Sequence, residues 1–322
     1  MTAMSRCAAS ISWKRSVADA PQALHGWIVI DKPLAMGSTN VVSWVKRALR
    51  EGGYAKVKIG HGGTLDPLAT GVLPVALGEA TKLAGRMLDA SKIYDFTISF
   101  GTQTDSLDLE GKVIATSGVR PTRAAVEAAL PSFRGSISQV PPAFSALKVD
   151  GQRAYDLARA GAEVELKARN VTIHALDVRD VVMNDAGLLD AVTLTAHVSK
   201  GTYIRSLARD IALALGTVGH VTMLRRVKAG AFGLESAISL DILDEHARGH
   251  SLGDLVSPLR TALDDIPALA LEAGQALALR QGRLLSGVAA PDGLHLATLG
   301  NVPVALVDVL DGTVTVERGF NL

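Results

Sequence analysis

The sequence has little of what defines several protein classes. A single cysteine, Cys7, excludes an internal disulfide framework and a cysteine metal cluster. No apolar run approaches the ~18 residues of a membrane-spanning helix. The longest candidate, residues 266–279, contains Glu272, Gly274 and Gln275. The net charge is only +1, so the total charge does not require a polyanionic partner.

What is present is enough for a folded protein. The chain has 322 residues, of which 48% are apolar, and this length suggests roughly two domains. A mainly disordered chain is excluded, because the sequence is neither highly charged nor poor in hydrophobic residues. Charge is unevenly distributed: residues 250–322 hold four basic and eight acidic residues, a net charge of −4, which leaves +5 for the remainder. Composition alone favours no function.

The first 25 residues show no sustained periodicity. We expect residues 1–25 to form a disordered N-terminal tail or an over-extended start, with Met4 as an alternative first residue. Arg6, Lys14 and Arg15 could suggest a transit peptide. The apolar core of about 7–15 residues that marks a secretory signal is missing, so we expect a cytoplasmic protein.

Secondary structure is predicted from periodicity and from turn residues. A buried strand is expected at 26–30, and a helix follows, with Ser38 as its N-cap and Gly52-Gly53 at its end. Residues 60–78 are expected to form a loop, because they contain five glycines and two prolines. Further strands are expected at 94–100, 171–182, 191–199 and 221–227, and a helix at 204–215.

The character of the chain changes near Ser257-Pro258. A short helix is expected at 272–281, and brief strands at 294–299, 302–309 and 314–318. A segment this short can form only a marginal core of its own. We therefore expect a small β-rich module that packs against the main domain.

The most informative segment is Gly60-His-Gly-Gly-Thr-Leu-Asp66-Pro-Leu-Ala-Thr-Gly71. Glycines let the backbone approach a ligand closely, and apolar neighbours would partly desolvate Asp66 and hold it in one orientation. Such a carboxylate suits a nucleophile or a general base. It could equally cap nearby backbone amides in a turn. The loop is not a Walker A motif, which ends in Gly-Lys-Ser/Thr.

The loop and several later segments resemble the bacterial tRNA pseudouridine-55 synthases, the TruB-type family. The matching segments are His61–Gly71 with Gly78-Glu-Ala-Thr-Lys82, then Lys92-Ile-Tyr94, Phe100–Asp105 with Asp108-Leu-Glu-Gly111, Gln139–Lys148 with Gly151–Tyr155, and Lys200–Asp210 with Leu224-Arg-Arg226. They occur in the family's order across about residues 26–230. Because the blocks are ordered, the resemblance is far more specific than one glycine-rich loop.

The resemblance implies a fold and a reaction. The fold is α/β (α+β), the pseudouridine synthase fold, with a mixed, largely antiparallel central sheet and a small β-rich, PUA-like C-terminal module. The implied domains are a catalytic domain at 26–255 and the C-terminal domain at 256–322. The implied reaction converts uridine 55 in the T-arm of tRNA to pseudouridine. It needs no cofactor and no metal, and we expect a monomer with no membrane contact.

The resemblance also implies a role for each site residue. Asp66 starts the chemistry, Arg205 keeps it ionised through a bidentate pair, and Tyr94 is a stacking platform for the flipped base. Tyr203 contacts the base or relays a proton, and Leu224 is an apolar wall against the base.

Basic residues would contact the RNA. By family analogy, His61 touches the RNA and helps to occupy the space that the extruded uridine leaves. Candidates for contacts with the RNA backbone are Lys82, Lys148, Arg153, Lys200, Arg225 and Arg226. Each of these side chains could instead be an ordinary structural or solvated group.

One segment departs from the family pattern. The first family block reads Asp-Lys-Pro-x-Gly-x-Thr-Ser, whereas this chain has Asp31-Lys-Pro-Leu-Ala35-Met-Gly37-Ser38. If the family's glycine requires a positive φ, Ala35 is strained unless Gly37 takes the flexible role.

Two other functions fit parts of the sequence. Asp66 could attack an anomeric carbon in a glycoside hydrolase, but that chemistry normally needs a second carboxylate about 5–9 Å away, and no paired motif is evident. A non-catalytic tRNA-binding or tRNA-folding protein would instead depend on Lys and Arg, and would not need Asp66.

Overall fold

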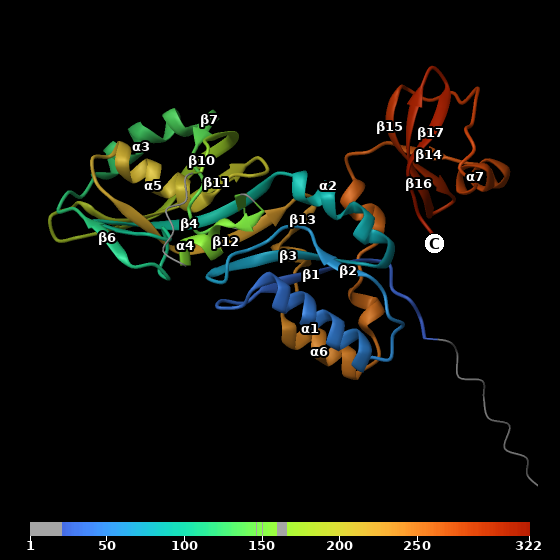
Figure 1. The fold of residues 1–322 in the computed structure, drawn as a ribbon, viewed down its shortest axis with the longest axis horizontal. Helices are drawn as coiled ribbons and strands as arrows, with labels where there is room; N and C mark the ends of the chain where they lie inside the picture. Colours follow the sequence, from blue (N-terminus) through green and yellow to red (C-terminus); the bar gives the residue numbers. More distant parts are fainter. Residues whose placement is uncertain (1–20, 146, 150, 160–165) are drawn as a thin grey trace, which may run out of the picture.

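A computed structural model describes residues 21–145, 147–149, 151–159 and 166–322. Within these residues the main sheet has nine strands, with the order β1-β3-β12-β4-β11-β10-β7, while β2 pairs with β3 and β13 with β12 (Figure 1). Among the described strands of this sheet, only β3 and β12 pair in parallel. The predicted mixed, largely antiparallel sheet is confirmed.

The elements have the following bounds. The strands of the main sheet are β1 (Gly26–Lys32), β2 (Ile59–His61), β3 (Ala69–Leu77), β4 (Lys92–Phe100), β7 (Gly135–Gln139), β10 (Arg169–Met183), β11 (Leu189–Val198), β12 (Gly219–Ala229) and β13 (Phe232–Gly233). Two hairpins are formed by β5 (Thr102–Thr104) with β6 (Val113–Thr116), and by β8 (Lys148–Val149) with β9 (Gln152–Arg153). The helices that precede the C-terminal module are α1 (Ser38–Glu51), α2 (Ala84–Asp89), α3 (Arg123–Ala129), α4 (Ala154–Arg159), α5 (Ile204–Ala214) and α6 (Leu240–Arg248). Short 3₁₀ turns are η1 (Gly78–Leu83), η2 (Leu130–Phe133), η3 (Leu234–Ser236), η4 (Leu252–Leu255) and η5 (Leu259–Leu263).

The prediction of a loop over residues 60–78 is wrong for most of that range. Residues 69–77 form β3, which pairs with β1 along seven residues and with β12 at Ala69–Gly71. Apolar side chains fill both faces of β3, so eight of its nine residues are buried. Pro74 lies beyond the segment paired with β12, where its missing N–H costs little. Glycine and proline content alone therefore misled the prediction.

Two helical layers cover different parts of the sheet. Helix α5 packs on β4, β10 and β11 in a core that includes Phe96, Ile98 and Leu194. Helices α1 and α6 lie side by side against β1 and β3 (Figure 1). Tyr94 and Leu224 pack against both cores. The two cores therefore meet at these two side chains.

The start of the fold lies before Gly26. Residues 1–20 of the expected tail lie outside the described residues. Leu24, however, is buried in the α1 core, and the Nδ1 atom of His25 accepts a hydrogen bond from the backbone N–H of Glu79. The last residues of the expected 1–25 tail therefore belong to the folded chain.

The loop that precedes α1 carries the strain predicted for the departure from the family block. Ala35 has φ = 61°, in the left-handed region that costs an L-residue roughly 1–2 kcal/mol. Gly37 has φ = −72°, so it does not take the flexible role. Gly37 is the N-cap of α1, and the prediction that Ser38 caps the helix is wrong.

Replacing Ala35 with Gly is expected to stabilise the protein. The substitution relieves the left-handed strain but adds entropy to the unfolded chain, so we expect the free energy of unfolding to rise by about 0.5–1 kcal/mol. Urea denaturation measures the change. Gly37→Ala is the matched control, since nothing lies within 4 Å of its added Cβ. If Ala35→Gly changed the free energy of unfolding by the same amount as Gly37→Ala, or lowered it, residue 35 would not be strained.

The C-terminal module is β-rich, as predicted. Its sheet has the order β14-β15-β16-β17, formed by β14 (Ala268–Ala270), β15 (Gly293–Leu299), β16 (Val302–Leu310) and β17 (Thr313–Gly319), with α7 (Ala273–Arg280) beside it. In Figure 1 it stands at one end of the molecule, away from α3 and α5. The division at residues 255 and 256 remains a prediction.

The end of the chain fastens this module to the rest. Phe320 is 1% exposed, in a core that includes Trp27, Leu83 and Leu306. The carboxylate of Glu79 accepts hydrogen bonds from Lys82 Nζ (2.7 Å) and from the backbone N–H of Asn321 (2.8 Å). Lys82 also donates to the carbonyl of Gly319 at 2.8 Å. The motif Gly78–Lys82 thus holds the chain terminus.

Phe320→Ala is expected to loosen this junction. Removing a fully buried phenyl ring costs about 3 kcal/mol or more, so denaturation should occur at a clearly lower urea concentration. Leu322→Ala is the control, because Leu322 is 42% exposed. Equal losses in the two variants would contradict the burial of Phe320.

Candidate active site

A cavity of about 350 Å³ opens where the two cores meet. Its walls come from the loop after β2, from β4, β12 and the segment that joins β11 to α5. The lining includes five residues that the sequence singled out, in addition to Asp66: Tyr94, Tyr203, Arg205, Leu224 and Arg226. The structure therefore brings together residues from distant parts of the chain.

Asp66 and Arg205 form an ion pair in this cavity. Arg205 Nη2 lies 3.0 Å from Asp66 Oδ2, so the pair implied by the resemblance is present, but through one nitrogen and not as a bidentate contact, because Nη1 faces Ser106 and Asp108. The Arg205 side chain is 6% exposed, whereas that of Asp66 is 38% exposed. The Asp66 carboxylate is thus open to the cavity, whereas the Arg205 guanidinium that compensates its charge lines the cavity but is almost wholly buried.

Arg205 is fixed by further contacts. Its Nη1 donates to the carbonyl of Ser106 (2.7 Å) and its Nη2 to that of Phe144 (2.9 Å). Asp108 Oδ2 lies 3.4 Å from Nη1. The planar guanidinium therefore bridges two carboxylates and two carbonyls, a geometry that a lysine cannot reproduce.

The loop that carries Asp66 is held on several sides. Ser38 Oγ accepts from the backbone N–H of Leu65 (2.8 Å) and donates to its carbonyl (3.0 Å). Lys32 is fully buried, and its ammonium donates to the carbonyls of Pro33, Met36 and Pro67. Burial lowers the pKa of Lys32 to about 8, against the opposing attraction of Asp66. These contacts place the carboxylate before any substrate binds.

Arg226 also holds the loop that carries Asp66, through hydrogen bonds to backbone carbonyls. It is 1% exposed, and its guanidinium donates to the carbonyls of Val72 (2.7 Å) and Gly63 (3.0 Å). Two of its donors are therefore turned inward, but Arg226 also lines the cavity, and its contact with the RNA backbone stays a prediction. Its neighbour Arg225 pairs with Asp31 at 2.7 Å.

The aromatic and apolar candidates lie on the cavity wall. Tyr94 is in β4, directly opposite Arg226 of β12. Leu224, in the same strand β12, is paired in parallel with Ala69. Tyr203 is the N-cap of α5 and lies two residues before Arg205. The half-buried rings of Tyr94 and Tyr203 leave space between them and Asp66.

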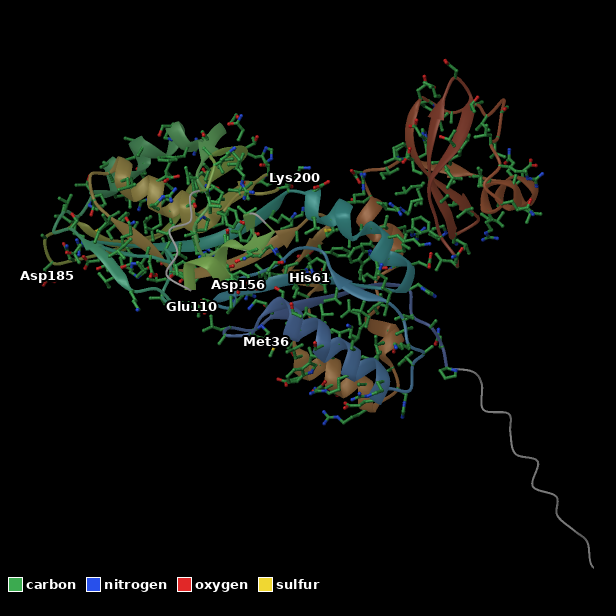
Figure 2. All side chains as sticks on the ribbon, in the orientation of Figure 1. Met36, His61, Glu110, Asp156, Asp185 and Lys200 are labelled. Atoms are coloured by element: carbon green, nitrogen blue, oxygen red, sulfur yellow. The ribbon has the colours of Figure 1, made fainter. Side chains whose placement is uncertain are left out.

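The predicted RNA contacts His61, Lys82 and Lys200 lie outside the cavity lining. His61 is in β2, and its Nδ1 accepts from the backbone N–H of Gly63 (3.4 Å); burial, followed by the charge of Arg226, lowers the pKa of His61. The Lys82 ammonium is bound to Glu79 and Gly319. Lys200 pairs with Asp89 at 3.0 Å, and Figure 2 shows His61 and Lys200 well apart. The side chains of Lys148 and Arg153 lie outside the described residues.

Sequence reasoning assigned no role to two buried charged residues. Asp108 is 7% exposed and faces Arg205, although its segment was part of the resemblance. Lys92 lines the cavity and donates to the carbonyls of Met87, Leu88 and Ala90; burial lowers its pKa to about 8. Both are charged residues within family blocks, which is a signal that could have found them.

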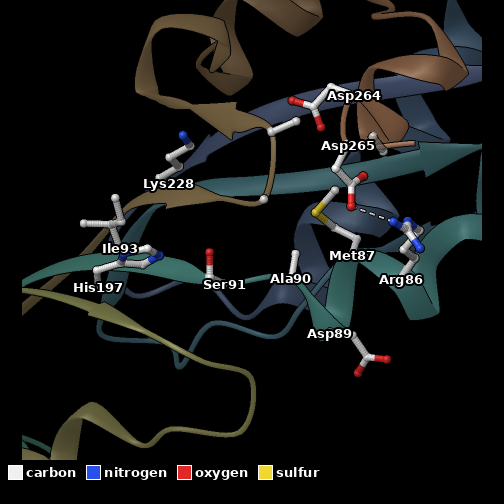
Figure 3. A pocket seen from close by; sticks show the side chains of 13 residues that line it. Arg86, Met87, Asp89, Ala90, Ser91, Ile93, His197, Lys228, Asp264 and Asp265 are labelled. Atoms are coloured by element: carbon white, nitrogen blue, oxygen red, sulfur yellow. Dashed lines mark hydrogen bonds and ion pairs between the residues drawn. The ribbon is translucent and has the colours of Figure 1, made fainter. Parts of the chain in front are cut away.

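A second cavity, of about 510 Å³, does not have Asp66 in its lining; Figure 3 shows the side chains that line it. It is lined by residues of α2, β12 and the segment after η5, with Arg86 and Asp265 forming an ion pair at 2.7 Å. Among the described residues, no group of three His, Cys, Asp or Glu side chains could hold a metal ion. No described helix is long and apolar enough to cross a membrane.

Comparisons with known proteins identify the family of the chain. Residues 49–204 match the model described as "TruB family pseudouridylate synthase (N terminal domain)", and residues 205–264 match "tRNA pseudouridylate synthase B C-terminal domain". A tRNA pseudouridine synthase B of Novosphingobium aromaticivorans is 65% identical over 299 residues, which cover 93% of this chain and 98% of that protein. A tRNA pseudouridine synthase B of Zymomonas mobilis is 56% identical, and the match covers 93% of this chain and 97% of that protein.

Solved structures share the fold. The "Structure of H/ACA RNP bound to a substrate RNA containing 2'-deoxyuridine" contains a chain with a TM-score of 0.69 and 25% identity, over 92% of this chain and 86% of that one. A chain of the "Crystal Structure of a Cbf5-Nop10-Gar1 Complex" has a TM-score of 0.68 and 26% identity, over 92% of this chain and 85% of that one.

Fold, site and relatives together define a pseudouridine synthase, an RNA-modifying isomerase. The pseudouridine synthase fold expected from the resemblance is confirmed. The chain belongs to the TruB family of these enzymes.

Proposed function

We propose that this enzyme converts uridine 55 in the T-arm of tRNA to pseudouridine, and that Asp66 starts the reaction. The observation that carries the proposal is the Asp66–Arg205 ion pair, at 3.0 Å, on the wall of a cavity of about 350 Å³. That volume is in the lower part of the range of about 300–1,000 Å³ for small-ligand sites, which suits one extruded nucleotide. The relatives named tRNA pseudouridine synthase B support tRNA as the substrate.

The reaction is an isomerisation that consumes no second reactant. The Asp66 carboxylate either attacks the ribose C1′ or removes the C2′ proton, and the C1′–N1 bond breaks. The detached uracil turns within the cavity, and its C5 bonds to C1′. The C5 proton leaves, N1 gains a proton, and Asp66 is regenerated. Arg205 compensates the carboxylate charge and holds its position throughout.

The cavity walls supply binding rather than chemistry. Tyr94 offers an aromatic face for stacking, and Leu224 an apolar wall that limits how the base can move. Tyr203 is placed to touch the base from the α5 side. A uridine enters only after it leaves the stacked loop, so recognition depends on RNA shape and on base flipping. His61 and Lys82 are proposed as contacts with RNA outside the cavity.

We further propose that the enzyme acts as a monomer in the cytoplasm.

Release of tritium tests the proposal. A T-arm stem-loop labelled at uridine C5 should lose tritium from one uridine per molecule, and a stem-loop with cytidine at position 55 should lose none. Tight binding without release would favour a tRNA-binding protein instead. Release of free uracil or sugar would favour hydrolysis.

A further inference from the structure

The segment between β11 and α5 forms one side of the uridine cavity. Gly201, Thr202 and Tyr203 all line it, and the backbone of Gly201 has φ = 78°. Tyr203 is the N-cap of α5, but its side chain makes no capping hydrogen bond. Within the helix, Tyr203 is held only through its carbonyl, which accepts from the backbone N–H of Leu207 (3.0 Å).

Gln139 holds this residue from the opposite side. Gln139 is the last residue of β7 and is fully buried. Its Oε1 accepts from the backbone N–H of Tyr203 (2.8 Å), and its Nε2 donates to the carbonyl of Tyr203 (3.2 Å). One side-chain amide thus satisfies both backbone polar groups of one residue. Without it, the Tyr203 N–H would lose its partner, at about 1–3 kcal/mol, whereas the Tyr203 carbonyl would keep the hydrogen bond from the backbone N–H of Leu207 (3.0 Å).

Arg169 holds the same segment from its strand. It is the first residue of β10 and is paired directly with Gln139 across the β7–β10 ladder. Its guanidinium carbon lies 4.6 Å from the centre of the Tyr203 ring, a cation–π contact. Its Nη2 donates to the carbonyl of Gly201. Gln139 therefore fixes the backbone of Tyr203, and Arg169 fixes its ring.

We propose that Gln139 and Arg169 are positioning residues that orient Tyr203, and through α5 also Arg205, for the isomerisation. This inference rests on the proposed function, because it assigns a purpose to the geometry of the same site. Gln139 does not line the cavity, so its effect on the substrate passes through Tyr203. A loss of alignment at this wall reduces the rate of the chemical step more than the affinity for RNA, because most RNA contacts lie elsewhere.

Two substitutions at Gln139 test the proposal. Gln139→Met keeps the length of the side chain but removes both hydrogen bonds. We expect the single-turnover rate at saturating enzyme to fall by about 10- to 100-fold, while the Kd for the stem-loop changes by less than about threefold. Gln103→Met, in β5 and outside the cavity lining, is the matched control and should keep the wild-type rate.

Gln139→Glu adds a readout that a packing role would not produce. An ionised Glu keeps the acceptor for the Tyr203 N–H but turns a second acceptor toward the Tyr203 carbonyl. A protonated Glu restores the donor, and burial favours the protonated form. The rate of Gln139→Glu, relative to wild type at each pH, should therefore rise by about tenfold as the pH falls from about 8 to 6.

Arg169→Met tests the second contact. Loss of the cation over the ring should reduce the rate by about threefold to tenfold. The proposal would be overturned if Gln139→Met matched the wild-type rate, or if Gln139→Glu showed a flat ratio over this pH range. Should Gln139→Met fail to fold, the pH ratio of Gln139→Glu decides alone. An inactive wild-type enzyme would instead refute the proposed function, so the two failures are distinguishable.

Discussion

Replacing Asp66 with Asn is expected to reduce pseudouridine formation at least about 1,000-fold while leaving RNA binding nearly unchanged. Asn has the same shape as Asp, so the loop should keep its contacts with Ser38 and Lys32. It has no carboxylate, so it can neither attack C1′ nor remove the C2′ proton. Single-turnover tritium release and filter binding measure the two effects separately.

The control for this variant is another carboxylate near the cavity. Asp89 is at the end of α2, is 63% exposed on its side chain and pairs with Lys200. Asp89→Asn should keep the rate within about twofold, because exposed ion pairs contribute little. Equal losses in the two variants would mean that general charge around the site, and not Asp66, sets the rate.

Arg205→Lys is expected to cause the second-largest loss, about 100-fold or more in rate. A lysine keeps the charge but cannot reach Asp66, Asp108 and two carbonyls from one planar group. The Asp108 carboxylate, which is 10% exposed on its side chain, would lose its only ion-pair partner among the described residues. The thermal midpoint should therefore fall as well.

Arg209→Lys is the control that distinguishes the loss of the Arg205 contacts from a general effect of replacing an arginine on α5. Arg209 is on the same helix, one turn after Arg205, and pairs with its neighbour Asp210. We expect its substitution by lysine to change the rate by less than about threefold. A fully active Arg205→Lys enzyme would contradict the role given to the guanidinium that bridges Asp66 and Asp108.

The sequence predicted much of the fold because its strands alternate. In β11, buried and half-buried residues alternate along Val192–Val198, which is the pattern of a strand with one covered face. Strand β3 was missed because both of its faces are covered, so its sequence does not alternate, and Gly71 and Pro74 suggested a loop. Gly71 is required there, since an added Cβ would lie 2.2 Å from the carbonyl oxygen of Arg226.

The site was predictable only in part. The pairing of Asp66 with Arg205 followed from the ordered family blocks, although 139 positions separate the two residues. The burial of Arg226 did not follow, because the carbonyls that it binds belong to Gly63 and Val72, which only the folded sheet brings close. The role of Gln139 was hidden for the same reason, since its partner Tyr203 is 64 positions away.

Mapping pseudouridine on one tRNA transcript tests the central claim most directly. Unmodified transcript is incubated with wild type or with Asp66→Asn, labelled with carbodiimide and read by primer extension. We predict a stop at position 55 with wild type and none with Asp66→Asn. A stop of equal strength with both proteins would remove Asp66 from the chemistry. No stop with wild type, despite tight binding of the transcript, would contradict the reaction itself.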